Sequence, residues 1–148
     1  MSTGTPPKFE GPLAFTQLDL PGGNIAFQRR THDAPSSPDM LQFFGGHIKE
    51  GETLLQAALR ELHEETDLPV GEMEFEEIGL FFVPKKGGIN RVAGLVKASI
   101  PDANFKDFEG QGTPEVWTPE SALNSGQLVT TVQYILEKTV NLRPVEEA

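Results

Sequence analysis

One segment of this 148-residue chain constrains the fold more than any other, residues 52–66 with the sequence ETLLQAALRELHEET. It contains no glycine or proline and is dominated by strong helix formers, so we expect a helix here. Leu55, Leu59 and Leu62 recur at i, i+4 and i+7, which predicts that they share one buried stripe. Pro69 then prevents the helix from continuing.

Strand-like segments stand on both sides of this helix. Four runs rich in β-branched and aromatic residues form two pairs joined by glycine-containing turns: 13–20 with 25–30, and 73–83 with 89–100. Two further helices are expected, a short one from Pro119 to about Asn124 with Thr118 as N-cap, and a last one over 127–140. The order ββαββαα predicts an α/β fold with a mixed sheet between helices.

The connecting segments and the ends of the chain are not expected to form helices or strands. Residues 31–39 and 101–114 are expected to be loops, because proline, glycine and polar residues interrupt any apolar period. Residues 1–12 and 143–148 are predicted to be tails, which leaves residues 13–142 as a single domain.

The composition excludes several classes of function. The formal net charge is −10 and the chain has no cysteine, so we expect neither nucleic acid nor an anionic membrane as a partner, and no disulfide or thiolate zinc site. No apolar run approaches the ~20 residues that span a bilayer. The first residues lack the basic-then-apolar order of a secretion signal. These features predict a cytoplasmic protein.

The predicted helix carries an unusual group of acids. Glu61, Glu64 and Glu65 stand at i, i+3 and i+4, so their carboxylates project from one side. Such crowding raises at least one pKa unless a hard dication, which prefers oxygen ligands, neutralises it. Magnesium or manganese is the inferred ion. The alternative is a solvated acidic face, which on the helix alone is the commoner explanation.

The residues around the helix favour the metal site. Gly45 and Gly46 precede it and let another group approach the backbone closely. Glu52 stands at its start, and Arg60 lies four residues before Glu64, where it can pair with that carboxylate and hold it.

Together these residues resemble the signature of the Nudix hydrolases, Gly-x5-Glu-x7-Arg-Glu-U-x-Glu-Glu-x-Gly-U, in which U is aliphatic. The positions that match in spacing are Gly46, Glu52, Arg60, Glu61, Leu62, Glu64, Glu65 and Leu68. The last glycine of the signature is replaced by Asp67, which we expect at the left-handed residue that ends the helix, at a small cost in stability.

The resemblance implies an α/β/α sandwich and the hydrolysis of a nucleoside diphosphate linked to another moiety, with Mg²⁺ or Mn²⁺ as cofactor. An ADP-ribose-like compound and a nucleoside triphosphate both stay open as substrates. A Nudix-fold module that binds a nucleotide without cleaving it is the alternative function. Many relatives are dimers, so pairing of two copies is a further expectation.

The resemblance also assigns roles to the signature residues. Glu64 and Glu65 would bind the metal, with the Gly45 carbonyl as a further ligand. Glu61 would bind metal or orient the attacking water. In the same pattern, Glu52 would support Glu61, and Arg60 would orient the acids.

Outside the signature the cues are weaker. Relatives often draw another acid from a later loop, and both Glu109 and Glu115 are candidates, with a slight preference for Glu109; either could also be a surface acid. Arg29 and Arg30 end the second strand and are the preferred candidates for receiving a phosphate, while Lys85, Lys86 and Arg91, which flank a hairpin turn, stay open. Pro84, sixteen residues past Leu68, resembles a mark of ADP-ribose pyrophosphatases, although a proline at a strand–turn junction needs no such role.

Overall fold

The computed structural model describes residues 9–84, 90–101 and 112–141. Seven strands form one sheet: β1 (Phe9–Asp19), β2 (Ile25–Arg29), β3 (Leu41–Gln42), β4 (Phe44–His47), β5 (Glu76–Val83), β6 (Asn90–Ser99) and β7 (Thr113–Trp117). The helices are α1 (Leu54–Glu65), α2 (Pro119–Leu123) and α3 (Thr130–Asn141), and short 3-10 turns lie at Pro21–Gly23 and Val70–Glu72. No helix in these described ranges has the length and apolar character needed to cross a bilayer.

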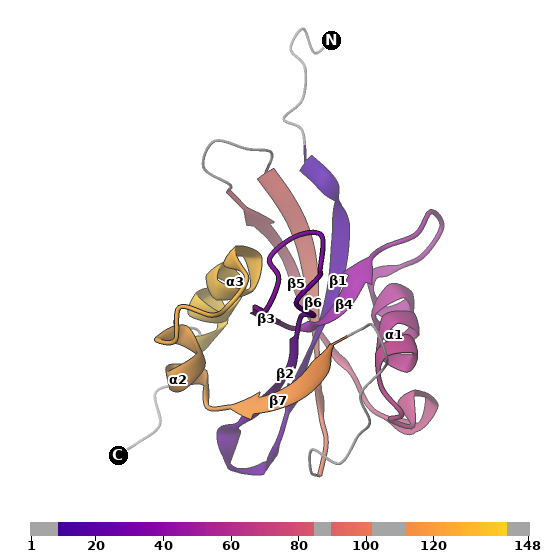
Figure 1. Ribbon diagram of the computed structural model, residues 1–148. Coiled ribbons are helices and arrows are strands. Elements are labelled where there is room, and N and C mark those ends of the chain that lie inside the picture. Colours follow the sequence, from indigo (N-terminus) through magenta and orange to yellow (C-terminus); the bar gives the residue numbers. More distant parts are fainter. Residues whose placement is uncertain (1–8, 85–89, 102–111, 142–148) are drawn as a thin grey trace, which may run out of the picture.

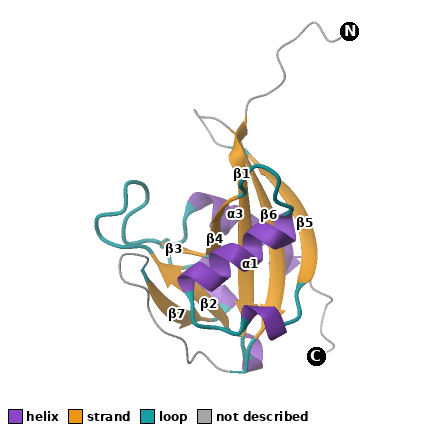
Figure 2. Cartoon of the chain, turned by 90° about the vertical axis from the view of Figure 1, so that its right-hand side faces the viewer, coloured by secondary structure: helices purple, strands orange, loops and turns teal. Residues whose placement is uncertain are grey.

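The helices cover both faces of the sheet. Helix α1 lies on one side, over β1, β4 and β6, whereas α2 and α3 lie on the other side (Figures 1 and 2). The predicted α/β/α sandwich is therefore confirmed.

Strand β1 is the centre of the sheet and makes it mixed. It runs parallel to β6 and antiparallel to β4 and β2. In this register Ala14 lies opposite Gly46, and Phe15 opposite Gly45. The two glycines that precede α1 are thus held in β4 against the central strand β1, shortly before the helix begins.

Large side chains fill the space between the sheet and α3. The Phe43 ring lies 5.9 Å from the Phe15 ring and 5.7 Å from the Phe27 ring, centroid to centroid. Val132 and Ile135 of α3 are fully buried against this cluster. Aromatic packing of this kind contributes beyond the area that it buries.

Small side chains fill the space under α1. Ala57, Ala58 and Leu62 are buried, whereas Leu55 and Leu59 are only partly buried. The expected stripe of three leucines is therefore only partly correct: Leu62 is in the core, but Leu55 and Leu59 lie on the flanks of the contact because the alanines face the sheet and let the helix approach it closely.

The hairpins and α2 follow the prediction, and several boundaries differ. Strand β1 begins at Phe9, inside the segment expected to be a tail. Residues 41–42 and 44–47, which follow the expected loop 31–39, form the short strands β3 and β4. Strand β7 was missed, since residues up to 114 were expected to be loop. It contains Pro114, and among the described strands it pairs with β2 alone, the edge placement at which proline is tolerated.

The ends of the two long helices also differ from expectation. Helix α3 begins at Thr130 and not at Gln127, because the backbone at Gln127 and Val129 hydrogen-bonds to Leu41 of β3. Helix α1 ends at an extended Thr66, whose hydroxyl donates to the Leu62 carbonyl at 2.8 Å. The left-handed conformation expected at Asp67 was wrong, since the positive φ angles of described non-glycine residues lie elsewhere.

Candidate active site

The two glycines of β4 lie directly against carboxylates from α1. The Gly45 N–H donates to Glu65 Oε1 at 2.9 Å. Gly45 has φ of 150°, and a Cβ there would overlap the Ala14 carbonyl oxygen. A Cβ on Gly46 would lie 2.6 Å from Oε2 of Glu61. The expected close approach to the double glycine is therefore present, and the approaching groups are the side chains of Glu61 and Glu65.

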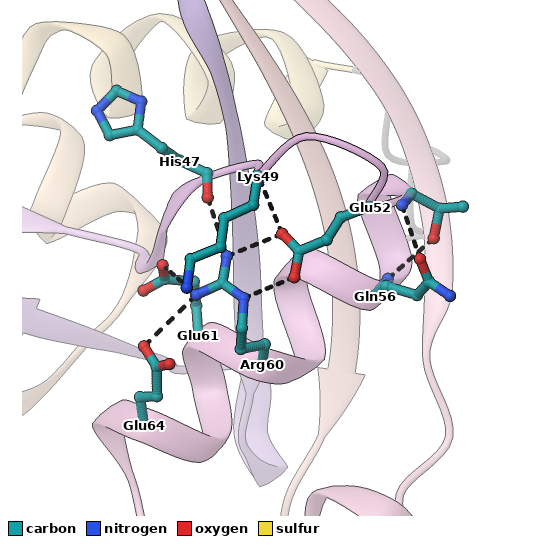
Figure 3. Close-up of polar contacts among 8 residues, drawn as sticks. His47, Lys49, Glu52, Gln56, Arg60, Glu61 and Glu64 are labelled. Carbon is teal, nitrogen blue, oxygen red and sulfur yellow. Dashed lines mark hydrogen bonds and ion pairs between the residues drawn. The ribbon is translucent and has the colours of Figure 1, made fainter.

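Arg60 lies at the centre of the polar contacts beside these glycines (Figure 3). It makes a forked contact with Glu52, Nε to Oε2 at 2.6 Å and Nη2 to Oε1 at 2.9 Å. Nη1 donates to Glu61 Oε2 at 3.0 Å, and Nη2 donates to the His47 carbonyl at 3.0 Å. The predicted pair with Glu64 is also present but longer, at 3.5 Å. Arg60 thus connects the loop before α1 to the acids on the helix.

The segment between β4 and α1 is folded around Glu52. Its Oε1 accepts the Lys49 N–H at 2.8 Å, and the next residue, Thr53, caps α1 by accepting the Gln56 N–H at 3.1 Å. The hydrogen bond from Arg60, with that from Lys49, lowers the pKa of Glu52 to about 2. The same contact with Glu52 raises the pKa of Arg60. Both groups are charged across the ordinary pH range.

The carboxyl group of Glu65 has the opposite kind of surroundings to that of Glu52. Only 7% of it is exposed. Burial, together with the neighbouring Glu61 and Glu64, raises its pKa to about 9, although the Gly45 N–H opposes this. The charge of a buried carboxylate beside other carboxylates is not balanced by a positive charge. A divalent cation bound among them would supply that charge. The hard oxygen donors of Glu61, Glu64 and Glu65 suit Mg²⁺ or Mn²⁺.

The acids do not already form a closed cage. Within residues 9–84, 90–101 and 112–141, no three carboxylate or imidazole side chains converge as a ready-made ion site. Glu61 and Glu65 face β4, whereas the side chain of Glu64 is 52% exposed and turned toward Arg60 (Figure 3). A cation there would have to draw Glu64 toward the other two.

Two cavities open beside this cluster. The larger has a volume of about 820 Å³ and is lined by Gly45, Gly46 and His47 of β4, and by Arg30, Pro84 and Arg91. The smaller, of about 240 Å³, is lined by Glu65 and also by Gly45 and Arg30. Arg30, one of the two arginines predicted to receive a phosphate, therefore lies beside both cavities, and Glu65 lines the smaller one with it.

The other arginine has different surroundings. Arg29 lies outside the lining of both cavities and forms a two-pronged ion pair with Glu115, with both nitrogen–oxygen distances at 2.7 Å. Trp117 Nε1 also donates to Glu115, at 3.0 Å. The contact with Arg29 lowers the pKa of Glu115. The structure thus brings Arg29 and Glu115 to each other and not to the acids of α1, and Glu109 lies outside the described residues.

Sequence reasoning did not find the segment that closes the larger cavity. Pro35, Ser36 and Ser37, within the expected loop 31–39, line one side of it. A run of serine and proline indicates only the absence of regular structure. No local signal in the sequence places this run across from the β4 glycines.

The comparisons with known proteins agree with this geometry. The family profile described as NUDIX domain matches residues 14–127. A protein of Xenopus laevis named m7GpppN-mRNA hydrolase NUDT17 is 39% identical over 57 residues, which are 38% of this chain and 19% of that protein. The chain thus aligns with about a fifth of that relative's length.

Solved structures share the fold at low sequence identity. A MutT protein from Methanosarcina mazei superposes with a TM-score of 0.73 at 16% identity, covering 95% of this chain and 100% of its own. The dihydroneopterin triphosphate pyrophosphohydrolase of E. coli gives 0.70 at 16% identity, covering 93% and 99%. A bifunctional NMN adenylyltransferase/ADP ribose pyrophosphatase of Francisella tularensis, solved with AMP and a manganese ion, gives 0.69 at 15% identity, covering 93% and 43%. Because the family profile covers most of the chain, including the two glycines and the acidic helix, the chain belongs to the Nudix family.

Proposed function

We propose that this protein is a divalent-metal-dependent hydrolase that cleaves the diphosphate bond of a small nucleotide. The observation that carries the proposal is the packing of the Glu61 and Glu65 carboxylates against Gly45 and Gly46 at the edge of the larger cavity. A buried acid with a raised pKa in a cleft is a typical mark of a functional site.

Three acids and the arginine of the signature then have defined tasks. Glu61, Glu64 and Glu65, with the Gly45 carbonyl, would hold the ion. A bound divalent cation would neutralise phosphate oxygens and lower the pKa of its water. Arg60 fixes the position of the Glu61 carboxylate through its 3.0 Å contact. This positioning matters because phosphoryl transfer depends on alignment more than on covalent chemistry by the protein.

For the distal acid we propose Glu109. Its competitor Glu115 already accepts hydrogen bonds on both oxygens, from Arg29 and from Trp117, and its pKa is lowered. A general base needs a pKa near the working pH and a free oxygen facing the water that it activates.

For the substrate we propose a single nucleotide, either ADP-ribose-like or a nucleoside triphosphate. A cavity of about 820 Å³ lies within the roughly 300–1,000 Å³ that small ligands occupy, and Arg30 supplies a guanidinium for a phosphate. The net charge of −10 disfavours a long polyanion such as capped mRNA. A structural relative named in part as an ADP ribose pyrophosphatase supports the first candidate, and one named for dihydroneopterin triphosphate, which is a pterin and not a nucleotide, supports only the cleavage of a triphosphate.

A substrate panel tests this proposal. ADP-ribose, nucleoside triphosphates, dinucleoside polyphosphates, nucleotide sugars and a cap dinucleotide are incubated in ¹⁸O water with and without Mg²⁺, and the products are identified by mass. We expect Mg²⁺-dependent cleavage of one of these classes, which is lost in Glu64→Gln. Glu137→Gln, which changes an exposed glutamate of α3, is the matched control and should retain activity. Metal-independent turnover, or nucleotide binding without products, would reject the proposal.

A further inference from the structure

Two neighbouring arginines at the end of β2 have different environments. Successive side chains of a strand point to opposite sides. Arg30 lines both cavities, and its hydrogen bond to the described residues runs from Nε to the Ser36 carbonyl at 2.9 Å. The Arg29 side chain points the other way, and its guanidinium group hydrogen-bonds to other residues of the protein.

The contacts of Arg29 join four parts of the chain. Nε and Nη2 donate to the two oxygens of Glu115 on β7, while Nη1 donates to the Asp39 carbonyl at 2.8 Å and to Gln127 Oε1 at 2.7 Å. The side chains of Arg29 and Glu115 are 23% and 33% exposed, so water screens the pair only in part. A planar fork with this many fixed partners defines a position more sharply than a single ion pair does.

The partner Gln127 extends this network toward α3. Its backbone carbonyl accepts the Leu41 N–H at 2.8 Å, and Val129 N–H donates to the Leu41 carbonyl at 2.9 Å. Val129 in turn lines the larger cavity. Arg29 is therefore linked to the cavity wall that comes from the start of α3.

The other linked part is the segment 31–39, which connects β2 to β3 (Figure 1). Ser37 and Asp39 have φ of 48° and 63°, a left-handed conformation that such residues adopt only when their surroundings hold it. Asp39 is held at three atoms: its carbonyl by Arg29, its N–H by the Thr31 carbonyl at 3.3 Å, and its carboxylate by His32 at 2.8 Å.

This segment forms a wall of the site. Pro35, Ser36 and Ser37 line the larger cavity, and Thr31 and Pro35 line the smaller one, next to Glu65. A shift of the segment would change the shape of both cavities while leaving α1 and its acids in place.

We propose that Arg29, through Glu115, Asp39 and Gln127, is a positioning residue that fixes the 31–39 segment as a wall of the substrate cavity and thereby sets substrate affinity. The inference rests on the proposed function for its kinetic part. It assigns Arg29 a role through the loop and leaves direct contact with phosphate to Arg30.

The kinetic test uses Arg29→Lys and Glu115→Gln, measured on the substrate that the wild type cleaves best. We expect KM to rise about tenfold in each, with kcat within about twofold, because the acids of α1 are untouched. Asp19→Asn is the matched control: it breaks the 3.4 Å ion pair between Asp19 and Lys97 on the same sheet, away from the residues that line either cavity, and should leave KM unchanged. Unchanged KM in both test variants, or a loss confined to kcat, would overturn the inference.

A second test does not need activity. Trypsin cleavage after Arg30 reports opening of the segment, and it should be several-fold faster in Glu115→Gln than in the wild type and in Asp19→Asn. The only tryptophan of the chain, Trp117, donates to Glu115, so its fluorescence should shift in the same variant. If the wild type cleaves no substrate, the proposed function fails while faster cleavage after Arg30 still supports the positioning role. Equal cleavage rates would overturn that role.

Discussion

Substitution of Gly46 by alanine should separate catalysis from folding in this protein. The backbone at Gly46 lies outside the left-handed region, so alanine can adopt it. The new Cβ, however, would lie 2.6 Å from the carboxyl carbon and Oε2 of Glu61 and 2.7 Å from Oε1. Ordinary contacts of a Cβ begin at 3.4 Å, so the carboxylate must retreat by about 0.8 Å.

The size of the expected effect follows from that displacement. A catalytic group misplaced by about 1 Å costs on the order of 100-fold in rate, equivalent to ~2.7 kcal/mol of transition-state stabilisation. Folding should change much less, because Glu61 lies at the end of a flexible side chain and a compatible Gly→Ala change contributes about 0.4–1 kcal/mol through the unfolded state. The 3.0 Å contact between Glu61 and Arg60 should lengthen.

The assay compares kcat, KM and thermal melting of Gly46→Ala with those of Gly71→Ala. A Cβ at Gly71 meets no atom within 4 Å, so this control should behave as wild type. We expect kcat of Gly46→Ala to fall about 100-fold while its Tm stays within a few degrees. Wild-type kcat in Gly46→Ala would refute the placement of Glu61 in the active site.

Three further predictions follow from the same helix. Arg60→Lys should lower kcat at least tenfold, because an ammonium cannot fork to Glu52 and also reach Glu61; steady-state kinetics at wild-type level would contradict this. Thr53→Ala removes the N-cap of α1 and should lower the free energy of unfolding by ~1 kcal/mol, seen as a lower Tm with unchanged kcat, whereas an unchanged Tm would contradict the capping role. Without metal, stability should fall as the pH rises from about 4.3 toward 9, since the folded state keeps a proton on Glu65 (pKa about 9) that the unfolded state releases; urea melts across this range should lose the slope in Glu65→Gln, and a persisting slope would assign it to another group.

The sequence alone was sufficient to predict those features that interactions between nearby residues determine. Helix α1 follows from an uninterrupted run of helix formers, and the spacing of Gly46, Arg60 and Glu61 predicted the acidic centre before any geometry was known. The double glycine predicted that some group approaches the backbone closely, whereas only the structure identifies that group as the carboxylates of Glu61 and Glu65.

The features of the fold and of the site that the sequence did not predict depend on contacts between distant segments. Strand alternation predicts that Arg29 and Arg30 point to opposite sides, but not which of them faces the cavities. That depends on distant residues such as Glu115, 86 residues away, which pairs with Arg29. Strand β7 and the late start of α3 likewise depend on pairing with β2 and β3. Intrinsic propensity cannot anticipate such pairings, since tertiary context overrides it.

The central claim is that the acids of α1 hold a divalent cation for a nucleotide in the adjoining cavity. The most direct measurement is a crystal structure of the protein soaked with Mg²⁺ and a non-hydrolysable analogue of its best substrate. The account predicts an ion about 2.1 Å from carboxylate oxygens of Glu61, Glu64 or Glu65, with the diphosphate between that ion and Arg30. A nucleotide in the cavity with these carboxylates turned to solvent and no ion among them would contradict it.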